Sequence, residues 1–307
     1  MNETLRCVGF NLTASRLQFV ETERVSDQFS IISYGQTFIS PPITVDNFSE
    51  MNLHHYLQAA FEEVKIRTAI TCNAASFSLP PELFMIIQLP YDSNLTQKEI
   101  RDEFIWEISK LYPFVGIDNL AMKFYELGSG FLTGRNNALI VALNKIFLIQ
   151  IKNFCLQNNL TPKLIDCASI AANSYINTNN SDKQSANIHL YNSRNTVTLF
   201  VNISSKPAYV KVLKKSSQVS FKSIVDELSD QKFGKLKNDY SLSAVISGDE
   251  ISEDLFSELR ETTGLSFKQF NPFDFIRLHS EVNNDGIESG SFSSFTSAVG
   301  IASRFNS

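Results

Sequence analysis

The chain contains few of the residues from which metal sites and disulfide frameworks are built. Its 307 residues include only four cysteines and four histidines. The cysteines are too far apart for the short paired spacings of a zinc site, at Cys7, Cys72, Cys155 and Cys167. The histidines show no ligand spacing either, at His54, His55, His189 and His279. We therefore predict no metal site, and thiols that stay reduced.

Long apolar runs and basic clusters are also missing. The longest apolar runs, such as 138–143, are far shorter than the roughly 20 residues that span a bilayer. The formal charge is -5, the pI is near 5.5, and Lys211, Lys214 and Lys215 form only a small basic spot, so we expect no nucleic-acid partner. The acidic N-terminus runs directly into a strand pattern, so we expect no signal peptide and a cytoplasmic protein.

Common catalytic motifs are absent as well. The sequence has no P-loop, no G-x-S-x-G turn and no G-x-G-x-x-G after a strand. The glycine-rich segment 128–134 falls in a turn between two strand patterns. We therefore assign no catalytic residue.

What remains is the composition of a folded globular protein. Hydrophobic residues make up 43% of the chain and charged residues 19%, whereas a disordered chain would have fewer apolar residues and a larger net charge. A length of 307 residues favours two lobes over one compact core.

The first half of the chain begins with strand patterns. We predict a strand pair over 5–21 and a third strand at 29–33. A helix over 51–67 follows, because its apolar residues recur at i, i+3, i+4 and i+7. A strand at 74–79 then ends at a pair of prolines.

A small inserted unit is predicted next. A strand at 84–89 precedes a helix that begins at Thr96, where Glu99 three residues later completes a capping box. The remaining elements of the unit are strands at 121–127 and 138–143, a helix at 146–157 and a strand at 163–165.

The second half is predicted to be another α/β unit. Residues 177–185 contain no apolar side chain and form the expected hinge. Strands are expected beyond it at 186–191, 196–202, 208–213 and 243–247, with helices at 218–230 and 252–263. A polar loop at 281–291 precedes a final helix over 292–303, whose apolar residues lie on one face.

Several short segments, in this order, carry a family resemblance. Residues 8–18 align with a V-G-I-D-I-G-S-S-x-[IV]-K turn, and residues 160–166 with a strand that ends in Ile-Asp. The other matching segments are 78–80, 89–90, 112–113, 247–248, 271–273 and 298–304. Together they resemble the actin-like ATPases, specifically the PilM family of type IV pilus and related secretion assemblies.

The resemblance implies an α/β fold of the actin-like ATPase (ribonuclease H-like) type, with two lobes and a small α/β subdomain inserted in the first. The expected divisions are the first lobe core at 1–83, the insertion at 84–166, a return helix and hinge at 167–180, the second lobe at 181–290 and a C-terminal helix at 291–307.

It also implies a nucleotide site in which two glycine-rich turns present backbone N–H groups to phosphates and an acid in each turn serves the metal ion. In this chain Asn11 replaces the first acid and Thr13 replaces the glycine, with Ser15 two residues further. A neutral amide brings no charge to a hard cation, and a Cβ obstructs the approach of a phosphate.

The second turn departs further from the family pattern. His189-Leu190-Tyr191 aligns with D-I-G, so an aromatic ring is expected in the place of the glycine. We expect His189 to be an outward-facing polar residue of an alternating strand. We expect Arg194 to be a solvated loop arginine.

The third loop, expected to read S-G-G-G, is Ser247-Gly248-Asp249-Glu250. Two carboxylates beside a triphosphate are repulsive, and each unit pair costs roughly 3–4 kcal/mol at ~4–6 Å and an effective dielectric of ~20. We therefore expect a degenerate nucleotide site and a pseudo-ATPase rather than an enzyme, with ATP and Mg²⁺ as cofactors only where this site still binds them.

One helix face adds a candidate partner site. Glu99, Glu103 and Glu107 recur at i+4 spacing, which favours a solvated face, with an acidic docking strip for a basic juxtamembrane segment as the alternative. Trp106 on the same helix is expected in the core, with an interface anchor as the alternative.

The resemblance finally implies a cytoplasmic assembly adaptor of a type IV pilus or type II secretion-like machine. Such a protein binds the N-terminal cytoplasmic tail of a single-span inner-membrane protein, in a groove between the first lobe and the insertion. It is thereby peripheral to that membrane and coupled to a cytoplasmic pilus or secretion ATPase. A homodimer is left open. The alternatives are an active ATP-binding ATPase and a filament-forming actin-like scaffold.

Overall fold

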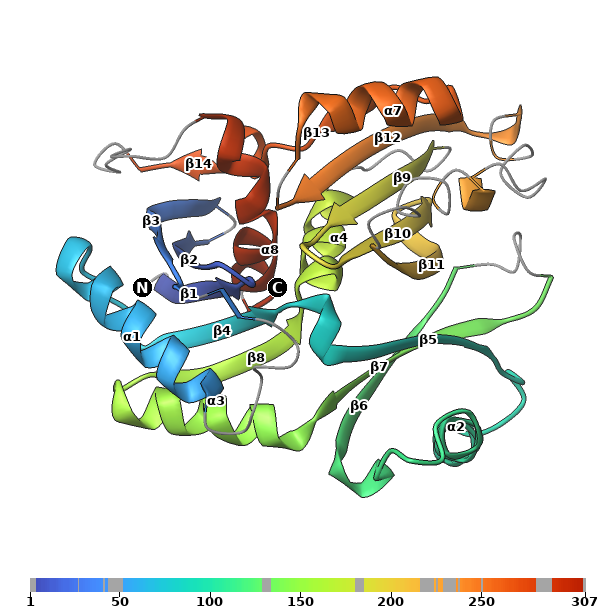
Figure 1. Cartoon of the computed structure of the whole chain (residues 1–307), viewed down its shortest axis with the longest axis horizontal. Coiled ribbons are helices and arrows are strands. Elements are labelled where there is room, and N and C mark those ends of the chain that lie inside the picture. Colours follow the sequence, from blue (N-terminus) through green and yellow to red (C-terminus); the bar gives the residue numbers. More distant parts are fainter. Residues whose placement is uncertain are drawn as a thin grey trace.

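The computed structural model describes residues 4–26, 28–40, 42–43, 52–128, 134–179, 185–215, 224, 226–228, 236, 238–249, 251–279 and 289–305. Within these residues the chain forms sheets of six, five and three strands (Figure 1).

The six-stranded sheet has the order β14-β3-β2-β1-β4-β8. One face is covered by helices α1 (Asn52–Arg67) and α3 (Lys145–Gln157), with Phe10 stacked on Phe77 at a ring-centroid distance of 5.2 Å. The strands are β1 (Thr4–Leu12), β2 (Arg16–Val25), β3 (Gln28–Phe38), β4 (Ala74–Leu79), β8 (Thr161–Cys167) and β14 (Arg277–Leu278).

The five-stranded sheet has the order β11-β10-β9-β12-β13, and α7 (Glu253–Thr263) packs on it. Its strands are β9 (Ser185–Asn192), β10 (Thr196–Ile203), β11 (Lys206–Lys214), β12 (Ser241–Gly248) and β13 (Phe267–Gln269).

The two large sheets repeat one topology. In each, three antiparallel strands are followed along the chain by two strands parallel to the first, so that β3-β2-β1-β4-β8 corresponds to β11-β10-β9-β12-β13. This repetition confirms the predicted two-lobe α/β fold, and it makes positions in the two lobes directly comparable.

Two helices, α4 (Ala168–Thr178) and α8 (Thr296–Phe305), lie side by side between the two large sheets (Figure 1). A Cβ at Gly9 of β1 would lie 2.3 Å from the carbonyl oxygen of Ala298, and a Cβ at Gly300 would lie 2.2 Å from that of Ala171. Helix α8 therefore packs at backbone distance against β1 and α4. The final helix predicted over 292–303 is divided into the 3-10 turn η5 (Ser289–Phe295) and α8.

The inserted unit is a three-stranded sheet with the order β5-β7-β6, covered on its outer side by α2 (Gln97–Leu111). The capping box predicted from Thr96 and Glu99 is present. The other elements are β5 (Phe84–Pro90), η3 (Ile117–Asn119), β6 (Leu120–Glu126) and β7 (Asn137–Asn144).

The insertion ends earlier than the predicted boundary at residue 166. Strand β8 pairs with β4 in the first large sheet. Phe154 of α3 meets Phe61 of α1 edge-on, with ring centroids 5.3 Å apart. Both elements therefore belong to the first lobe, and the insertion comprises 84–144.

Parts of several expected elements lie outside the described residues. They are residues 180–184 of the hinge, most of the helix at 218–230, residues 281–288 of the polar loop, and Glu250. The helix α4 ends at Thr178, within the expected hinge.

Candidate functional site

The two hairpin turns that should face a nucleotide have the same backbone geometry. The N–H of Thr13 donates to the carbonyl of Arg16 at 2.9 Å in the turn between β1 and β2. In the turn between β9 and β10, the N–H of Ser193 donates to the carbonyl of Thr196, also at 2.9 Å. Thr13 and Ser193 are therefore equivalent positions in the two lobes.

This equivalence corrects the predicted alignment of the second turn. Leu12 pairs with Leu17 and Asn192 pairs with Val197 across their hairpins. Counting back from these pairs, Tyr191 stands in the place of Asn11. Tyr191 thus occupies the position of the acid rather than that of the glycine, and the prediction was displaced by two residues.

The first turn is held by neutral hydrogen bonds. Asn11 is completely buried, and its Nδ2 donates to Oε1 of Gln18 at 2.9 Å. Ser78 Oγ donates to Asn11 Oδ1 at 2.9 Å, and Gln18 Nε2 donates to Ser294 Oγ at 2.6 Å. Asn11 therefore connects β1 to β2 and β4, with both polar atoms of its side chain engaged.

The side chain of Thr13 accepts hydrogen bonds from backbone amides of its own turn. Its Oγ1 accepts from the backbone N–H of Ser15 at 3.3 Å and from that of Arg16 at 3.1 Å. In an anion-binding turn such N–H groups would point at a phosphate. Here the threonine hydroxyl satisfies them, which is the usual behaviour of Ser and Thr side chains in turns.

Tyr191 brings an aromatic ring to the other acid position. The residue is 2% exposed and packs with Cys167, Ala168 and Phe200. Ser297 Oγ donates to the phenol oxygen at 3.1 Å. Burial, together with the nearby Asp249 carboxylate, raises the pKa of Tyr191 well above its ordinary value, so the ring stays neutral.

His189 is buried, and the prediction of an outward-facing residue was wrong. Both faces of the central strand β9 are covered, so alternation along it creates no solvent face. The imidazole lies 3.0 Å from Asn173 Oδ1 and 2.8 Å from Ser247 Oγ, and it stacks on Phe200. Burial lowers the pKa of His189 to about 3, which keeps the ring uncharged.

The third loop packs closely against the end of β9. Ser247 is completely buried against His189. Gly248 has a φ of +106°, and a Cβ there would lie 2.1 Å from the carbonyl oxygen of Asn192. The N–H of Asp249 donates to that carbonyl at 2.8 Å. This close approach of two strands requires the glycine.

Each lobe provides one carboxylate that binds the hairpin turn of the other lobe, across the cleft between the two turns. Asp249, after β12 of the second lobe, forms an ion pair with Arg16 at the first turn, with 3.1 Å between Oδ1 and Nη2. Glu82, in η2 (Pro81–Leu83) after β4 of the first lobe, accepts from the N–H of Asn195 and from Thr196 Oγ1, each at 3.2 Å. It also accepts from Ser193 Oγ. Arg16 and Thr196 occupy equivalent positions, so the contacts are reciprocal.

We call these contacts the cross-cleft pairs, Arg16–Asp249 and Glu82 with the second turn. Neither Arg16 nor Glu82 was predicted as a site residue. The sequence signal for Glu82 is an acid placed directly after a strand that ends in two prolines. For Arg16 it is a cation that directly follows the polar turn.

Little space is left between the two turns. A cavity of about 10 Å³ is lined by residues of both lobes, including Thr13, Glu82, Tyr191, Ser193 and Asp249. Such a volume holds about one water molecule, whereas ligand pockets of proteins measure roughly 300–1,000 Å³. Arg194 at the rim of this cavity is exposed, as expected.

A wider cavity of about 420 Å³ lies where the insertion meets both lobes. Leu139 comes from the insertion, Ile170 from α4, and Phe200 and Pro207 from the second lobe. At its edge Tyr125 of β6 donates to Asp166 at 2.8 Å, and Arg304 of α8 forms an ion pair with the same carboxylate. These contacts fix the insertion against the first lobe.

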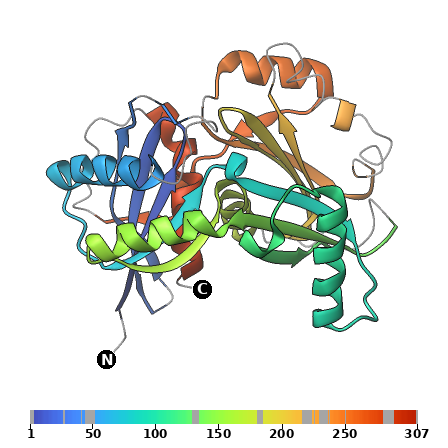
Figure 2. The same cartoon turned by 60° about the horizontal axis from the view of Figure 1, so that its bottom comes forward.

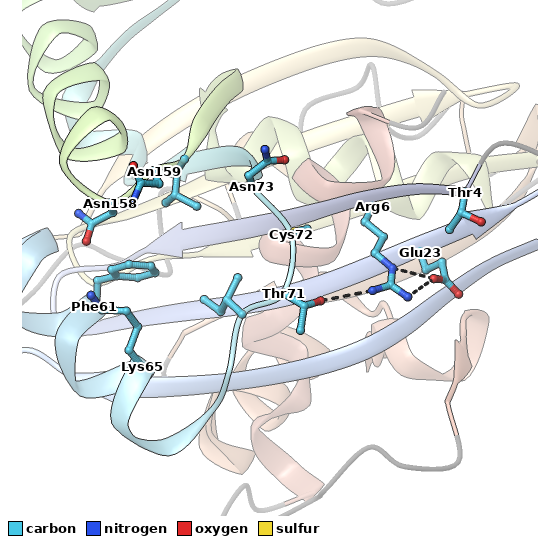
Figure 3. Close-up of a pocket in the computed structure, with 12 residues that line it drawn as sticks. Thr4, Arg6, Glu23, Phe61, Lys65, Thr71, Cys72, Asn73, Asn158 and Asn159 are labelled. Carbon is cyan, nitrogen blue, oxygen red and sulfur yellow. Dashed lines mark hydrogen bonds and ion pairs between the residues drawn. The ribbon is translucent and has the colours of Figure 1, made fainter.

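A third cavity, of about 890 Å³, lies at the opposite end of the first sheet, where β1 and β4 begin. Figure 3 shows Arg6 directed at Glu23 and Thr71 within it. Because the phosphate-facing turns lie where β1 and β9 end, this cavity belongs to no site predicted from the sequence.

The candidate partner residues lie on α2. Trp106 is 56% exposed and Glu103 is exposed, whereas Glu107 is half-buried. The core expectation for Trp106 was wrong, because the buried stripe of α2 consists of Ile100, Phe104 and Ile108 at i+4 spacing. Trp106 lies on the opposite side of the helix.

Over the described part of the chain, no group of three or more His, Cys, Asp or Glu side chains is placed to hold a metal ion. No helix among those residues is long and apolar enough to cross a membrane.

Comparison with solved structures identifies the fold. A chain of the PilM–PilN type IV pilus biogenesis complex superimposes with a TM-score of 0.68 at 15% identity, over 98% of both chains. The chain has the actin-like fold. A Bacteroides thetaiotaomicron protein with the actin-like ATPase fold and unknown function matches at 11% identity and a TM-score of 0.52, over 87% of this chain and 91% of the other. No protein-family model matches the sequence, and no curated protein does.

Proposed function

We propose that this PilM-like chain is an assembly adaptor of a type IV pilus or type II secretion-like machine that no longer hydrolyses ATP. It holds the N-terminal cytoplasmic tail of a single-span inner-membrane protein, stays at that membrane through this partner, and transmits its state to a cytoplasmic pilus or secretion ATPase. The end-to-end match to a chain from a complex of PilM with PilN supports a partner of the PilN kind.

The filled nucleotide cleft carries the proposal. Where a triphosphate would sit, the Thr13 hydroxyl accepts hydrogen bonds from two backbone amides of the first turn. The Glu82 carboxylate accepts a hydrogen bond from one backbone amide of the second turn. Neither turn retains an acid for Mg²⁺, because Asn11 and Tyr191 stand at those positions. A protein with this cleft acts by binding partners.

The tail is assigned to the cavity between the insertion and the lobes. Strand β6 is an edge strand of the inserted sheet, and its last residues, Tyr125 and Glu126, line that cavity. An extended tail adds backbone hydrogen bonds at such an edge, and apolar side chains of the tail enter the space between Leu139, Ile170 and Phe200.

The test is fluorescence polarisation with the labelled N-terminal tail of the single-span membrane protein encoded beside this chain. We expect micromolar binding that Ser174→Trp, which fills the cavity from α4, abolishes. Ser257→Trp on the exposed face of α7 is the matched control and should bind as the wild type does. Absence of wild-type binding at high micromolar concentration contradicts the proposal.

A further inference from the structure

The insertion is attached to the second lobe as well as to the first. Figure 1 and Figure 2 show the inserted sheet beside the five-stranded sheet, with β5 next to β11. The N–H of Gly128, two residues after β6 ends, donates to the carbonyl of Pro207 at 2.7 Å. The N–H of Val210 in β11 donates to Oε1 of Gln88 in β5 at 3.3 Å. The position of the insertion is therefore set by the second lobe as well.

Glu82 makes a third contact of this kind where the chain enters the insertion, a point that we call its root. The residue lies in η2, two residues before β5 begins at Phe84. Its carboxylate accepts from the N–H of Asn195 and from Thr196 Oγ1, each at 3.2 Å, and from Ser193 Oγ. Hydrogen bonds to a carboxylate are roughly twice as strong as those between neutral groups, so this contact outweighs the two neutral ones.

Both strands that begin at this contact lead to the cavity of about 420 Å³ to which the tail is assigned, which we call the tail cavity. Phe84, the first residue of β5, packs against the apolar cluster that contains Leu139 and Phe200. These two residues line the tail cavity. Thr196 is the first residue of β10, and Phe200, four residues further on, lies on the same face of that strand because side chains alternate. A shift at Glu82 would therefore move two walls of the cavity.

The opposite side of the tail cavity is held without Glu82. There Tyr125 of the insertion donates to Asp166 of β8 at 2.8 Å, and Arg304 of α8 pairs with the same carboxylate. The insertion is thus fixed to the first lobe on one side of the cavity and to the second lobe by the three contacts above. The width of the cavity between them depends on where Glu82 holds the second lobe.

We propose that Glu82 is the positioning residue of the tail cavity. By holding the second turn at the root of the insertion, its carboxylate keeps the cavity in the shape that binds the tail, so that binding does not have to order the walls. Glu82 is not among the residues that line the cavity, and it acts through β5 and β10. The effect on tail binding rests on the proposed function, whereas the effect on the insertion does not.

Amide hydrogen exchange of the full-length protein tests the effect on the insertion. The reporters are the N–H groups of Gly128 and Val210, because each of their hydrogen bonds joins the insertion to the second lobe. We expect Glu82→Ala to raise both exchange rates about tenfold, since local opening governs exchange. Glu82→Gln keeps an acceptor at the same reach and should raise them less. Thr196→Val, which removes a donor on the other side of the contact, should act in the same direction as Glu82→Ala.

Gly264→Ala is the control for a general loss of stability. Gly264 has a φ of +65° at the end of α7, on the side of the second lobe away from the insertion, so the substitution strains that lobe elsewhere. It should leave the exchange of Gly128 and Val210 unchanged. The same variants are then compared by fluorescence polarisation with the labelled tail of the membrane protein encoded beside this chain. Glu82→Ala should weaken binding about tenfold, and Gly264→Ala should not.

Unchanged exchange at Gly128 and Val210 in Glu82→Ala would overturn the proposal, and so would an equal rise in Gly264→Ala. Equal tail affinities of the wild type and Glu82→Ala would overturn the effect on the tail while supporting the proposed function. If the wild type binds no tail but the exchange rates rise as expected, the proposed function fails and the role of Glu82 at the insertion stands.

Discussion

Arg16 of the first lobe and Asp249 of the second form an ion pair across the cleft, at 3.1 Å, between two elements that an actin-like protein would place on either side of a triphosphate. Their side chains are only 16% and 11% exposed. With Glu82 bound to the opposite turn, each lobe supplies one carboxylate to the other. The protein's own charges thus connect the lobes where a nucleotide otherwise would.

Removing this ion pair should weaken the contact between lobes. We expect Arg16→Met to lower the free energy of unfolding by about 2 kcal/mol, because it removes the ion-pair partner of a mostly buried carboxylate. A double-mutant cycle with Asp249→Asn, measured by urea denaturation, should give a coupling of about 1 kcal/mol or more. The exposed pair Lys65–Glu62 on α1 is the control and should couple by less than about 0.5 kcal/mol. Additivity of the Arg16 and Asp249 variants would contradict the assignment.

Glu82 should behave as an internal substitute for a phosphate group. Glu82→Ala leaves the N–H of Asn195 and two hydroxyls of the second turn without their anion, which should cost about 2 kcal/mol of stability. Inorganic phosphate in tens of millimolar should then raise the Tm of the variant more than that of the wild type, because the emptied turn can take the anion. Glu62→Ala on the exposed face of α1 is the control. Equal phosphate effects on all three proteins would count against this role.

The buried imidazole of His189 predicts a dependence of stability on pH. Its pKa is about 3 in the folded protein and 6.5 ordinarily, so the unfolded chain binds one more proton between these values. The stabilisation is fully present above pH 6.5 and is lost as pH falls towards 3, by up to about 1.4 kcal/mol per pH unit. His189→Gln should be less stable at neutral pH and should show a shallower acid decline in urea titrations. If the pH dependence of the free energy of unfolding were the same in the variant and the wild type, the imidazole would have to take up its proton in the folded protein as well.

Gly248 should tolerate no side chain. Gly248→Ala combines a φ of +106° with a Cβ 2.1 Å from a backbone oxygen, and we expect a loss of about 3 kcal/mol or more. Gly264→Ala is the matched control, because it also has a positive φ but no atom within 4 Å of the added Cβ, and it should cost only about 1 kcal/mol. Thermal unfolding compares the two variants, and similar costs would show that backbone conformation alone explains the glycine.

The architecture could be predicted from the sequence because the local sequence patterns agree with the secondary structure that the fold contains. Alternating apolar residues, the capping box at Thr96 and the proline pair at the end of β4 each mark an element that the structure contains. The boundary of the insertion was misplaced because α3 is amphipathic, and its apolar face could cover either the inserted sheet or the first large sheet. Only the packing of Phe154 on α1 places it in the first lobe.

The site was harder to predict for reasons that lie in tertiary structure. The orientation of His189 was predicted from the alternation of one strand, and alternation carries no information when both strand faces are covered. Tyr191 was placed by a short motif alone. The register of the second turn depends on the hairpin pair Asn192 and Val197, which no short motif reveals. Arg16 and Asp249 are 233 positions apart, so their contact is visible only in the folded protein.

The most direct measurement of the central claim is a calorimetric titration of the purified full-length protein with Mg-ATP. We predict no saturable heat up to millimolar nucleotide, because the cross-cleft pairs and the Tyr191 ring fill the space between the turns. Saturable binding at micromolar concentration would contradict it, and would show that this cleft opens to admit a nucleotide.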